Sequence, residues 1–248
     1  MSYIRHCAIA AFAVCLGALA GQARSGVIIS GTRVVYSSEE KEVTVKLTNK
    51  GERPVLVQAW LDSGDSSLSP EQAKVPFVLS PPVFRMEGGK GQAVRLVYTD
   101  EPLPKDKETL FWFNVLEIPP KAGKDATNAL QFALRTRIKV FFRPEGLHGE
   151  VESAASQLTW KLARNDASSD VILEVVNPTP YHVSFSEVGL MAGDRSARSR
   201  NGGMVLPRGT TTFPLPDSSG MNLGEARAHF KVINDYGAVK SMDAPIGR

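Results

Sequence analysis

The clearest alternation of hydrophobic and polar positions lies in residues 130–144, which read LQFALRTRIKVFFRP. With one break at Thr136, every second position is apolar, namely Leu130, Phe132, Leu134, Ile138, Val140 and Phe142. A period of two residues predicts a β-strand with one face toward apolar surface. At about 3.3 Å per residue the strand would reach roughly 50 Å, whereas typical strands hold about 5–6 residues. Part of it is therefore expected to project or to lie at an exposed edge, which soluble proteins usually protect unless the edge is used.

The chain before Pro144 contains further short apolar runs separated by turn-forming residues. These runs cover residues 27–36, 43–49, 55–61, 77–79, 84–86, 93–98 and 109–118. The runs are too short, and too regularly bounded by Gly and Pro, to favour helices. About seven strands of this kind predict an immunoglobulin-like β-sandwich.

A second set of apolar runs follows Pro144. It covers residues 157–164, 171–177, 181–190, 210–213 and 226–234. The turn Pro144-Glu145-Gly146 is the expected linker. The two halves also echo each other, because a strand, an asparagine, a proline and a second strand follow one another in residues 45–61 and again in residues 171–188. The sequence therefore predicts an all-β chain of two modules, residues 24–144 and 145–248, each of about 100 residues.

The N-terminus, residues 1–23, is expected to be a cleaved secretory signal peptide. Arg5 precedes an apolar run over residues 7–20. At about 14 residues this run is too short to span a bilayer, and the small residues that follow allow cleavage after Ala20 or after Ala23. The mature chain is therefore expected to be secreted.

Cysteine usage and hydropathy describe the chain that remains after cleavage. Both cysteines, Cys7 and Cys15, lie in the signal segment, so the mature chain is expected to hold no disulfide. No later run reaches the roughly 18 apolar residues of a membrane-spanning helix. We therefore expect a soluble mature protein without membrane insertion.

Composition places the chain among globular proteins and excludes one class of partner. Of its 248 residues, 42% are hydrophobic, which is typical of a chain with a packed core. The formal net charge is +3, from 29 basic and 26 acidic residues. This balance lacks the concentrated basic face of a nucleic-acid-binding domain, so no nucleic-acid partner is expected.

Residues for catalysis, metal binding or cofactor binding do not stand out. The histidines of the mature chain, His148, His182 and His229, have no metal-ligand spacing and are expected to be surface or internally satisfied histidines. A G-x-S-x-G nucleophile elbow is absent, and the glycines of residues 88–91 fit a hairpin turn and not a phosphate loop. A secreted hydrolase would have to use those three histidines. We expect no catalytic residue, no metal and no cofactor.

Two cations lie in otherwise apolar strands. Arg33 falls within the run GVIISGTRVVY, and Lys139 falls within the long alternating strand. Each is either a solvated outer-face residue, a paired charge or a group directed at a ligand. If both project into one cleft, they form a suitable site for a carboxylate. Leu130, Phe132 and Leu134 likewise fit ordinary core positions on pattern alone.

Several blocks of sequence resemble one family in the order in which that family carries them. The blocks are TRVVY (32–36), LTNKGERPVLVQAWLD (47–62), PPVFR (81–85), LPKDKETLFWFNVLEIPP (103–120), RIKVFFRP (137–144), NPTPYHVSF (177–185) and INDYG (233–237). Together they resemble the periplasmic pilus-assembly, or fimbrial, chaperones of the chaperone–usher pathway. The resemblance spans nearly the whole mature chain.

The resemblance implies a boomerang of two immunoglobulin-like domains with an interdomain cleft, located in the periplasm. It implies a chaperone that donates a strand to pilin subunits lacking their last strand, and then delivers them to an outer-membrane usher. By position, it assigns strand donation to Leu130, Phe132 and Leu134, anchoring of the pilin's C-terminal carboxylate to Arg33 and Lys139, and an interdomain charge network to Glu108, Arg143 and Asp235. It also allows self-association of the free protein as a cover for the donor strand.

Other points stay open at this stage. The short segment 121–129 resembles the short-loop branch of the family, whereas Phe132 is bulkier than the aliphatic residue expected there. The last residues, KSMDAPIGR, match no family block. In a regular pleat Lys139 and Leu134 face opposite sides, so either the strand twists or bulges between them or a ligand meets the strand edge-on. The alternatives to a pilin chaperone are a chaperone for a non-pilus surface fibre and a secreted two-domain adhesin or fibre component.

Overall fold

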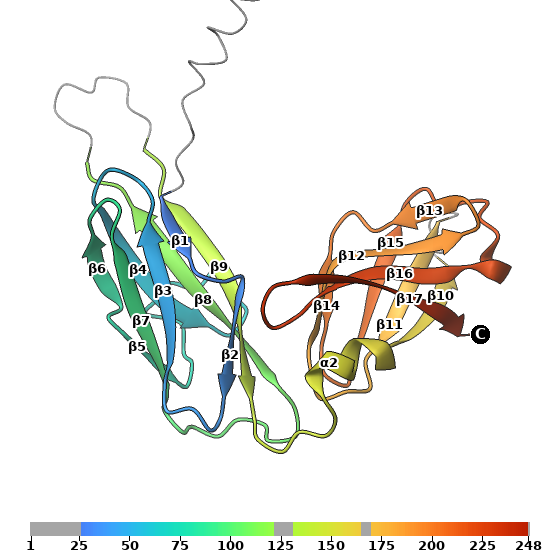
Figure 1. The fold of residues 1–248 in the computed structure, drawn as a ribbon, viewed down its shortest axis with the longest axis horizontal. Coiled ribbons are helices and arrows are strands. Elements are labelled where there is room, and N and C mark those ends of the chain that lie inside the picture. The colour runs from blue at the N-terminus through green and yellow to red at the C-terminus, as the bar shows by residue number, and fades with distance from the viewer. Residues whose placement is uncertain (1–25, 122–130, 165–169, 248) are drawn as a thin grey trace, which may run out of the picture.

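The computed structural model describes residues 26–121, 131–164 and 170–247, which form two β-sandwiches (Figure 1). The N-terminal domain is built from β1 (Val27–Ile29), β2 (Arg33–Ser37), β3 (Val43–Asn49), β4 (Val55–Asp62), β5 (Phe77–Ser80), β6 (Val83–Met86), β7 (Gly91–Tyr98), β8 (Thr109–Ile118) and β9 (Leu134–Arg143). The C-terminal domain is built from α2 (Val151–Ala154), η1 (Ala155–Gln157), β10 (Thr159–Arg164), β11 (Val171–Val176), β12 (Val183–Ala192), β13 (Arg195–Arg198), β14 (Gly203–Val205), β15 (Thr210–Leu215), η2 (Leu223–Glu225), β16 (Arg227–Ile233) and β17 (Val239–Gly247). The predicted all-β fold of two immunoglobulin-like domains is confirmed.

Two sheets pack face to face in the N-terminal domain. One has the strand order β1-β3-β7-β5 and the other β2-β9-β8-β4-β6. Alternate residues of β3 and β7 are buried between them, as period-two patterning requires. Near the base of the sandwich the Phe77 ring lies 5.4 Å from the ring of Tyr36 and 5.1 Å from that of Phe111. This core holds the five-stranded sheet in place, and the outer face of that sheet carries the candidate site.

The first apolar run, residues 27–36, forms two strands and not one. β1 pairs with β3 in the four-stranded sheet, whereas β2 pairs in parallel with β9 in the five-stranded sheet. The chain changes sheets at Gly31, whose φ of +124° favours glycine. The crossing brings Arg33 into the five-stranded sheet beside β9.

The long alternating strand is shorter than its pattern predicts. β9 begins at Leu134, Phe132 precedes it, and Leu130 lies outside the described residues. Its neighbour β8 ends at Ile118 and is followed by Pro119 and Pro120. The register would place Phe132 and Gln131 opposite Pro119 and Pro120. Because proline has no N–H group to donate to a ladder, these two residues have no regular partner there.

The last strand of the C-terminal domain, β17, connects its two groups of strands. The strand order is β13-β12-β16-β17-β10-β11-β15, and β14 pairs with β12. β17 pairs along β16 and then in parallel with β10, where Ile246 lies opposite Trp160. Trp160 is buried, with its ring 4.6 Å from that of Phe230. The C-terminal residues without a family block therefore join the two halves of this domain.

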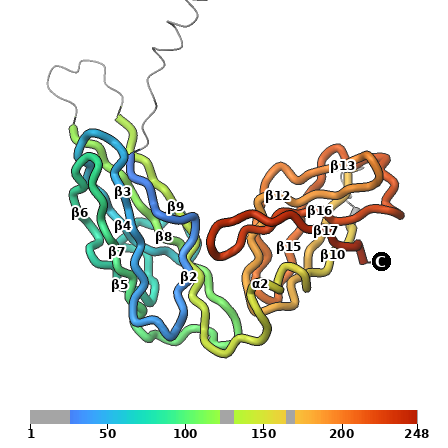
Figure 2. The backbone as a smooth tube through the Cα atoms, in the orientation of Figure 1, coloured from blue at the N-terminus to red at the C-terminus, as the bar shows by residue number. Residues whose placement is uncertain are grey.

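The two domains meet at an angle (Figure 2). The connection runs from the end of β9 to α2, and the expected boundary at Pro144 falls between these elements. The hairpin between β16 and β17 points toward the N-terminal domain (Figure 1). No helix in the described ranges is both long enough and apolar enough to cross a membrane.

Candidate functional site

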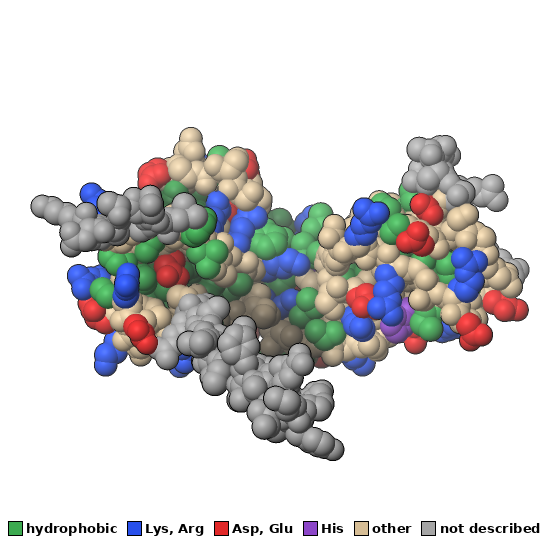
Figure 3. Space-filling model, turned by 90° about the horizontal axis from the view of Figure 1, so that it is seen from above, with side chains coloured by type: hydrophobic (Ala, Val, Ile, Leu, Met, Phe, Trp, Pro, Cys, Tyr) green, Lys and Arg blue, Asp and Glu red, His purple; other side chains and the backbone are tan. Residues whose placement is uncertain are grey.

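Arg33 and Lys139 lie side by side on the outer face of the five-stranded sheet. They are direct partners in the parallel pairing of β2 with β9, so their side chains leave the sheet on the same face. Both reach the C-terminal domain: Arg33 Nη1 donates to the Ile233 carbonyl at 2.9 Å, and Lys139 Nζ donates to Ser184 Oγ at 3.0 Å. Viewed from above, Lys and Arg side chains gather with apolar ones in the hollow between the domains (Figure 3). We call Arg33 and Lys139 the anchor pair.

The anchor pair is short of negative charge. Within the described part of the chain, no carboxylate forms an ion pair with either residue, although the charge of Asp235 acts on Arg33 at longer range. Burial, together with the neighbouring charge of Arg33, lowers the pKa of Lys139 to about 8. Burial also lowers the pKa of Arg33. Two cations held together in a partly buried site are suited to bind an anion with two oxygens.

Glu108, Arg143 and Asp235 form a second charge cluster at the junction of the domains. Arg143 Nε donates to Glu108 Oε1 at 2.7 Å, and Arg143 Nη1 donates to Asp235 Oδ2 at 2.8 Å. Glu108 and Arg143 belong to the N-terminal domain, and Asp235 lies in the β16–β17 hairpin. The structure thus brings together the three residues that the resemblance assigns to an interdomain network.

His182 is a further member of this network, which the sequence did not single out. Its backbone N–H donates to Glu108 Oε2 at 2.8 Å, and its Nδ1 lies 3.0 Å from the same oxygen. Its ring also packs against Phe141 at 5.2 Å. Burial alone would raise the pKa of Glu108, but the hydrogen bonds from His182 and the charge of Arg143 hold it below its usual value. We call Glu108, Arg143, His182 and Asp235 the interdomain network.

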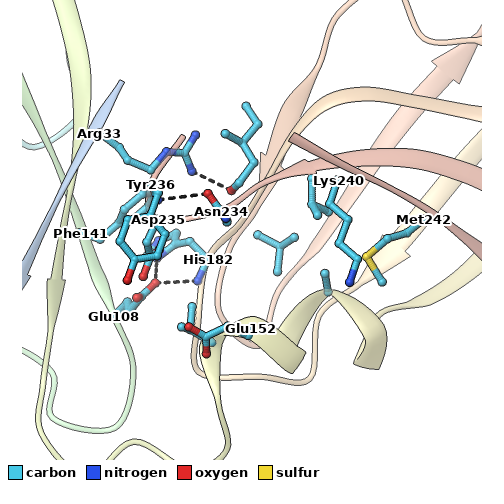
Figure 4. A pocket seen from close by; sticks show the side chains of 15 residues that line it. Arg33, Glu108, Phe141, Glu152, His182, Asn234, Asp235, Tyr236, Lys240 and Met242 are labelled. Carbon is cyan, nitrogen blue, oxygen red and sulfur yellow. Dashed lines mark hydrogen bonds and ion pairs between the residues drawn. The ribbon is translucent and has the colours of Figure 1, made fainter. Parts of the chain in front are cut away.

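A cavity of about 220 Å³ is lined by Arg33 of the anchor pair and by Glu108, His182 and Asp235 of the interdomain network (Figure 4). Arg33 extends over it from β2, while Glu108 and His182 face each other on its lower side. Val183 and Val232 of the C-terminal domain contribute apolar lining. Polar contacts around this cavity therefore connect the two domains, and the two hydrophobic cores do not merge there.

At the end of the N-terminal domain away from the domain junction, which we call the tip, β9 has an open edge (Figure 1). On one side β8 pairs with Leu134–Phe142, but on the other side β2 pairs only with Lys139–Arg143. Residues 134–138 therefore have no strand beside them on that side, among the described residues. Leu134 and Phe132 are 56% and 73% exposed, although Leu134 has the same parity as the buried Ile138. We call residues 134–138 the open edge.

The register of β9 bears on how Lys139 and Leu134 could both contact one ligand. The pairing of β8 with β9 continues without a shift from Leu134 to Phe142, so no bulge reverses the faces. Lys139 therefore faces outward, while Leu134 has the parity of the core. Of the two interpretations, the register favours a ligand that approaches the strand edge-on, because such a ligand can touch both residues.

A candidate metal site does not assemble in the described ranges. No group of three His, Cys, Asp or Glu side chains is placed to hold a metal ion. His182 is bound to Glu108, and His229 Nδ1 lies 2.8 Å from Asp243 on the far domain. The described site therefore offers two adjacent cations, an unpaired strand edge and exposed apolar side chains.

Both halves of the chain match models of one protein family. The model for the pili and flagellar-assembly chaperone, PapD N-terminal domain, matches residues 26–148. The model for the pili assembly chaperone PapD, C-terminal domain, matches residues 153–244. The probable fimbrial chaperone YadV of Escherichia coli (strain K12) is 42% identical over 241 residues, which cover 94% of each chain.

Solved structures of similar proteins have the same two-domain fold. The Pseudomonas aeruginosa CupB2 chaperone is 40% identical with a TM-score of 0.75, over 89% of this chain and 100% of that one. The Salmonella enterica SafB chaperone, solved in complex with the SafA pilin, is 28% identical with a TM-score of 0.73, over 92% of this chain and 99% of that one. Identity and coverage at this level over both domains show that the chain belongs to the PapD family of pilus-assembly chaperones.

Proposed function

We propose that this protein is a periplasmic chaperone that binds pilin subunits and delivers them to an outer-membrane usher. The observation that carries the proposal is the anchor pair, two adjacent cations without an ion-pair partner in the described chain, at the end of an unpaired strand edge. A polypeptide that pairs with the edge and ends in a free carboxylate would satisfy both features. The similar SafB chaperone was solved with a pilin, which supports this class of partner.

The open edge supplies the first part of pilin capture. A pilin with an incomplete sheet would pair its backbone with residues 134–138 and cover their free N–H and C=O groups. Phe132 and Leu134 would enter its apolar groove, and burial of each contributes roughly 1.5–3 kcal/mol before the free-energy cost of association. Leu130, the third residue assigned by resemblance, lies outside the described residues.

The anchor pair supplies the second part. A C-terminal carboxylate between Arg33 and Lys139 would accept charge-assisted hydrogen bonds from both and relieve their mutual repulsion. It would also define the register of the paired strand, because a slip of one residue turns every side chain to the other face. The proposal therefore couples recognition of the pilin's last residue to correct placement of the apolar side chains.

Co-expression with candidate pilins tests this function. We expect the wild-type protein to co-purify with a pilin in a one-to-one complex, identified by mass spectrometry. Either Arg33→Ala or Lys139→Ala should abolish capture, because it removes one of the two carboxylate ligands. Lys46→Ala serves as the matched control, since Lys46 is an exposed strand lysine on the opposite sheet. Normal complex formation by either anchor variant would refute the anchor, and capture lost by the control would show a general defect.

A further inference from the structure

Beside the open edge, the outer face of the five-stranded sheet carries a cluster that none of the steps above uses. It contains two arginines, two tryptophans and one aspartate from three adjacent strands, namely Trp60, Asp62, Trp112, Arg135 and Arg137. Arg135 and Arg137 alternate with the core-parity residues of β9, so both face outward, like Lys139. The cluster thus lies between the anchor pair and the tip of the domain.

Asp62 is the centre of this cluster and is fully buried. Arg137 donates to both of its carboxylate oxygens, with Nε at 3.2 Å from Oδ2. Arg135 Nη2 lies 3.4 Å from Oδ2, and Asn114 Nδ2 donates to the same oxygen at 2.8 Å. One carboxylate therefore serves two guanidinium groups.

Both guanidinium groups are held in place before any ligand arrives. Arg135 lies 4.7 Å from the centre of the Trp60 ring, and Arg137 lies 4.4 Å from that of Trp112. Arg135 also donates to Asn114 Oδ1 from Nε and Nη2, at 3.0 and 2.7 Å. Groups that are already ordered lose little conformational freedom on binding.

The charges on this face do not cancel. Arg135, Arg137 and the anchor pair present four cations. Asp62 pairs with Arg135 and Arg137, and the charge of Asp65 acts on Arg137 at longer range, so positive charge still exceeds negative charge here. The side chains of Arg135 and Arg137 remain 28% and 21% exposed, so their surplus positive charge is accessible to a ligand. In a ligand strand paired with the open edge, every second side chain would lie next to this positive charge.

The direction of such a strand follows from the two ends of the site. If its C-terminus lies at Lys139 and its preceding residues run toward Leu134, it runs parallel to β9. In a parallel pair, neighbouring residues share a face, so its outward side chains lie next to Arg137 and Arg135. Its inward side chains would lie on the same side as Leu134 and Ile138.

We propose that Arg135 and Arg137 select pilins whose last strand carries acidic side chains at the outward-facing positions nearest the C-terminus. This inference rests on the proposed function, because it uses the anchor pair to place the strand. Opposite charges on adjacent strands favour pairing, and like charges oppose it. Pilins with lysine or arginine at these positions would be bound more weakly.

Fluorescein-labelled strand peptides with a free C-terminal carboxylate test the inference against the intact mature protein. The peptides are identical except at two outward positions, which are both Glu, both Gln or both Lys. Two sets place this pair at even or at odd positions counted from the C-terminus, because only one parity faces outward in a strand. By fluorescence anisotropy we expect Glu to bind more tightly than Gln, and Gln more tightly than Lys, by up to about fivefold per position and in one set only.

Variants of the protein sharpen the result. Arg135→Gln should reduce the preference for Glu over Gln, and Arg135→Glu should favour Lys. The matched control is Arg95→Gln, since Arg95 is an exposed outward arginine on the opposite sheet, and it should leave the preference unchanged. The peptide series with wild-type protein stands by itself if a variant does not fold.

The outcomes separate this inference from the proposed function on which it rests. C-terminally amidated peptides should bind much more weakly in every series. If free-carboxylate peptides bind better than amides but Glu, Gln and Lys bind equally in both sets, the charge selection is wrong and the anchor stands. If amidation has no effect, the anchor is wrong and the inference falls with it.

Discussion

Lys139 and Arg143 point from the same face of β9 toward the same domain, yet their electrostatic surroundings are opposite. Arg143 contacts two carboxylates, Glu108 and Asp235, and its charge is fully matched. Lys139 meets a hydroxyl group and lies beside a second cation, Arg33. One residue, Phe141, is all that separates them on this face of the strand.

The difference indicates separate roles for Arg143 and Lys139. A matched, buried cluster whose members come from two domains defines how those domains meet. A partly buried pair of like charges is unfavourable in the free protein and becomes favourable when an anion binds. The same strand thus carries the interdomain network near the domain junction and the proposed ligand site nearer the tip.

The largest expected effect is the loss of stability when the interdomain network is disrupted. Arg143→Ala leaves the carboxylate of Glu108, which is 3% exposed, without its arginine, and a buried charge that loses its partner costs about 3–5 kcal/mol. We expect the free energy of unfolding, measured by urea denaturation, to fall by that amount. The domain junction should also loosen, which small-angle X-ray scattering would detect as a broader distribution of interdomain distances.

An exposed ion pair provides the control for this variant. Arg85 and Glu87 form a salt bridge at 2.8 Å, but their side chains are 66% and 57% exposed. Arg85→Ala should change the free energy of unfolding by less than about 1 kcal/mol. Equal losses for Arg143→Ala and Arg85→Ala would show that the interdomain network has no special structural role.

Sequence reasoning predicted much of the fold because burial on alternate positions leaves a direct pattern. The strands β3, β4, β7 and β8 coincide closely with the apolar runs that predict them. β13 and β17 had no such signal, since β13 reads RSAR and β17 contains Lys240, Asp243 and Pro245. Strands formed from polar residues depend on their neighbours in the sheet and not on their own pattern.

The site was less accessible from sequence. A cation in an apolar strand marked Arg33 and Lys139, but their adjacency depends on the sheet crossing at Gly31 and on a parallel register. His182 carried no signal, because its partner Glu108 is distant in sequence and in the other domain. The partner strand of β9 also set where the alternating segment becomes a strand, which periodicity alone could not show.

The next effect concerns the pH dependence of ligand binding at Lys139. Its pKa is lowered to about 8 in the free protein, and a bound carboxylate would raise it again. Lys139 is therefore mostly charged at pH 7 and mostly neutral at pH 9, so binding at pH 9 requires uptake of a proton. We expect affinity for a pilin, or for a peptide with a free carboxylate, to fall about tenfold between these pH values. Fluorescence anisotropy in buffers of equal ionic strength measures the change.

Lys139→Arg is the control for the pH effect, since a guanidinium group stays charged throughout this range. The variant should lose most of the pH dependence and retain binding at pH 9. Wild-type affinity that is constant from pH 7 to 9 would contradict the assignment of Lys139 to the carboxylate. The same tenfold loss in the variant would assign the titration to another group.

The smallest effect has the opposite sign to the first. The folded-state pKa of Lys139, about 8, is below its usual value of 10.5, so the charged form destabilises the free protein. Lys139→Met should therefore raise the free energy of unfolding at pH 7 by about 1 kcal/mol, since the residue is only partly buried and also loses its hydrogen bond to Ser184. The gain should be complete below pH 8 and should shrink as the pH rises toward 10.5, because Lys139 then loses its proton in the folded protein.

Lys46→Met, on the exposed face of β3, should show no such pH-dependent gain. A loss of stability in Lys139→Met comparable to that in Arg143→Ala would place both residues in one structural cluster and remove the distinction between them.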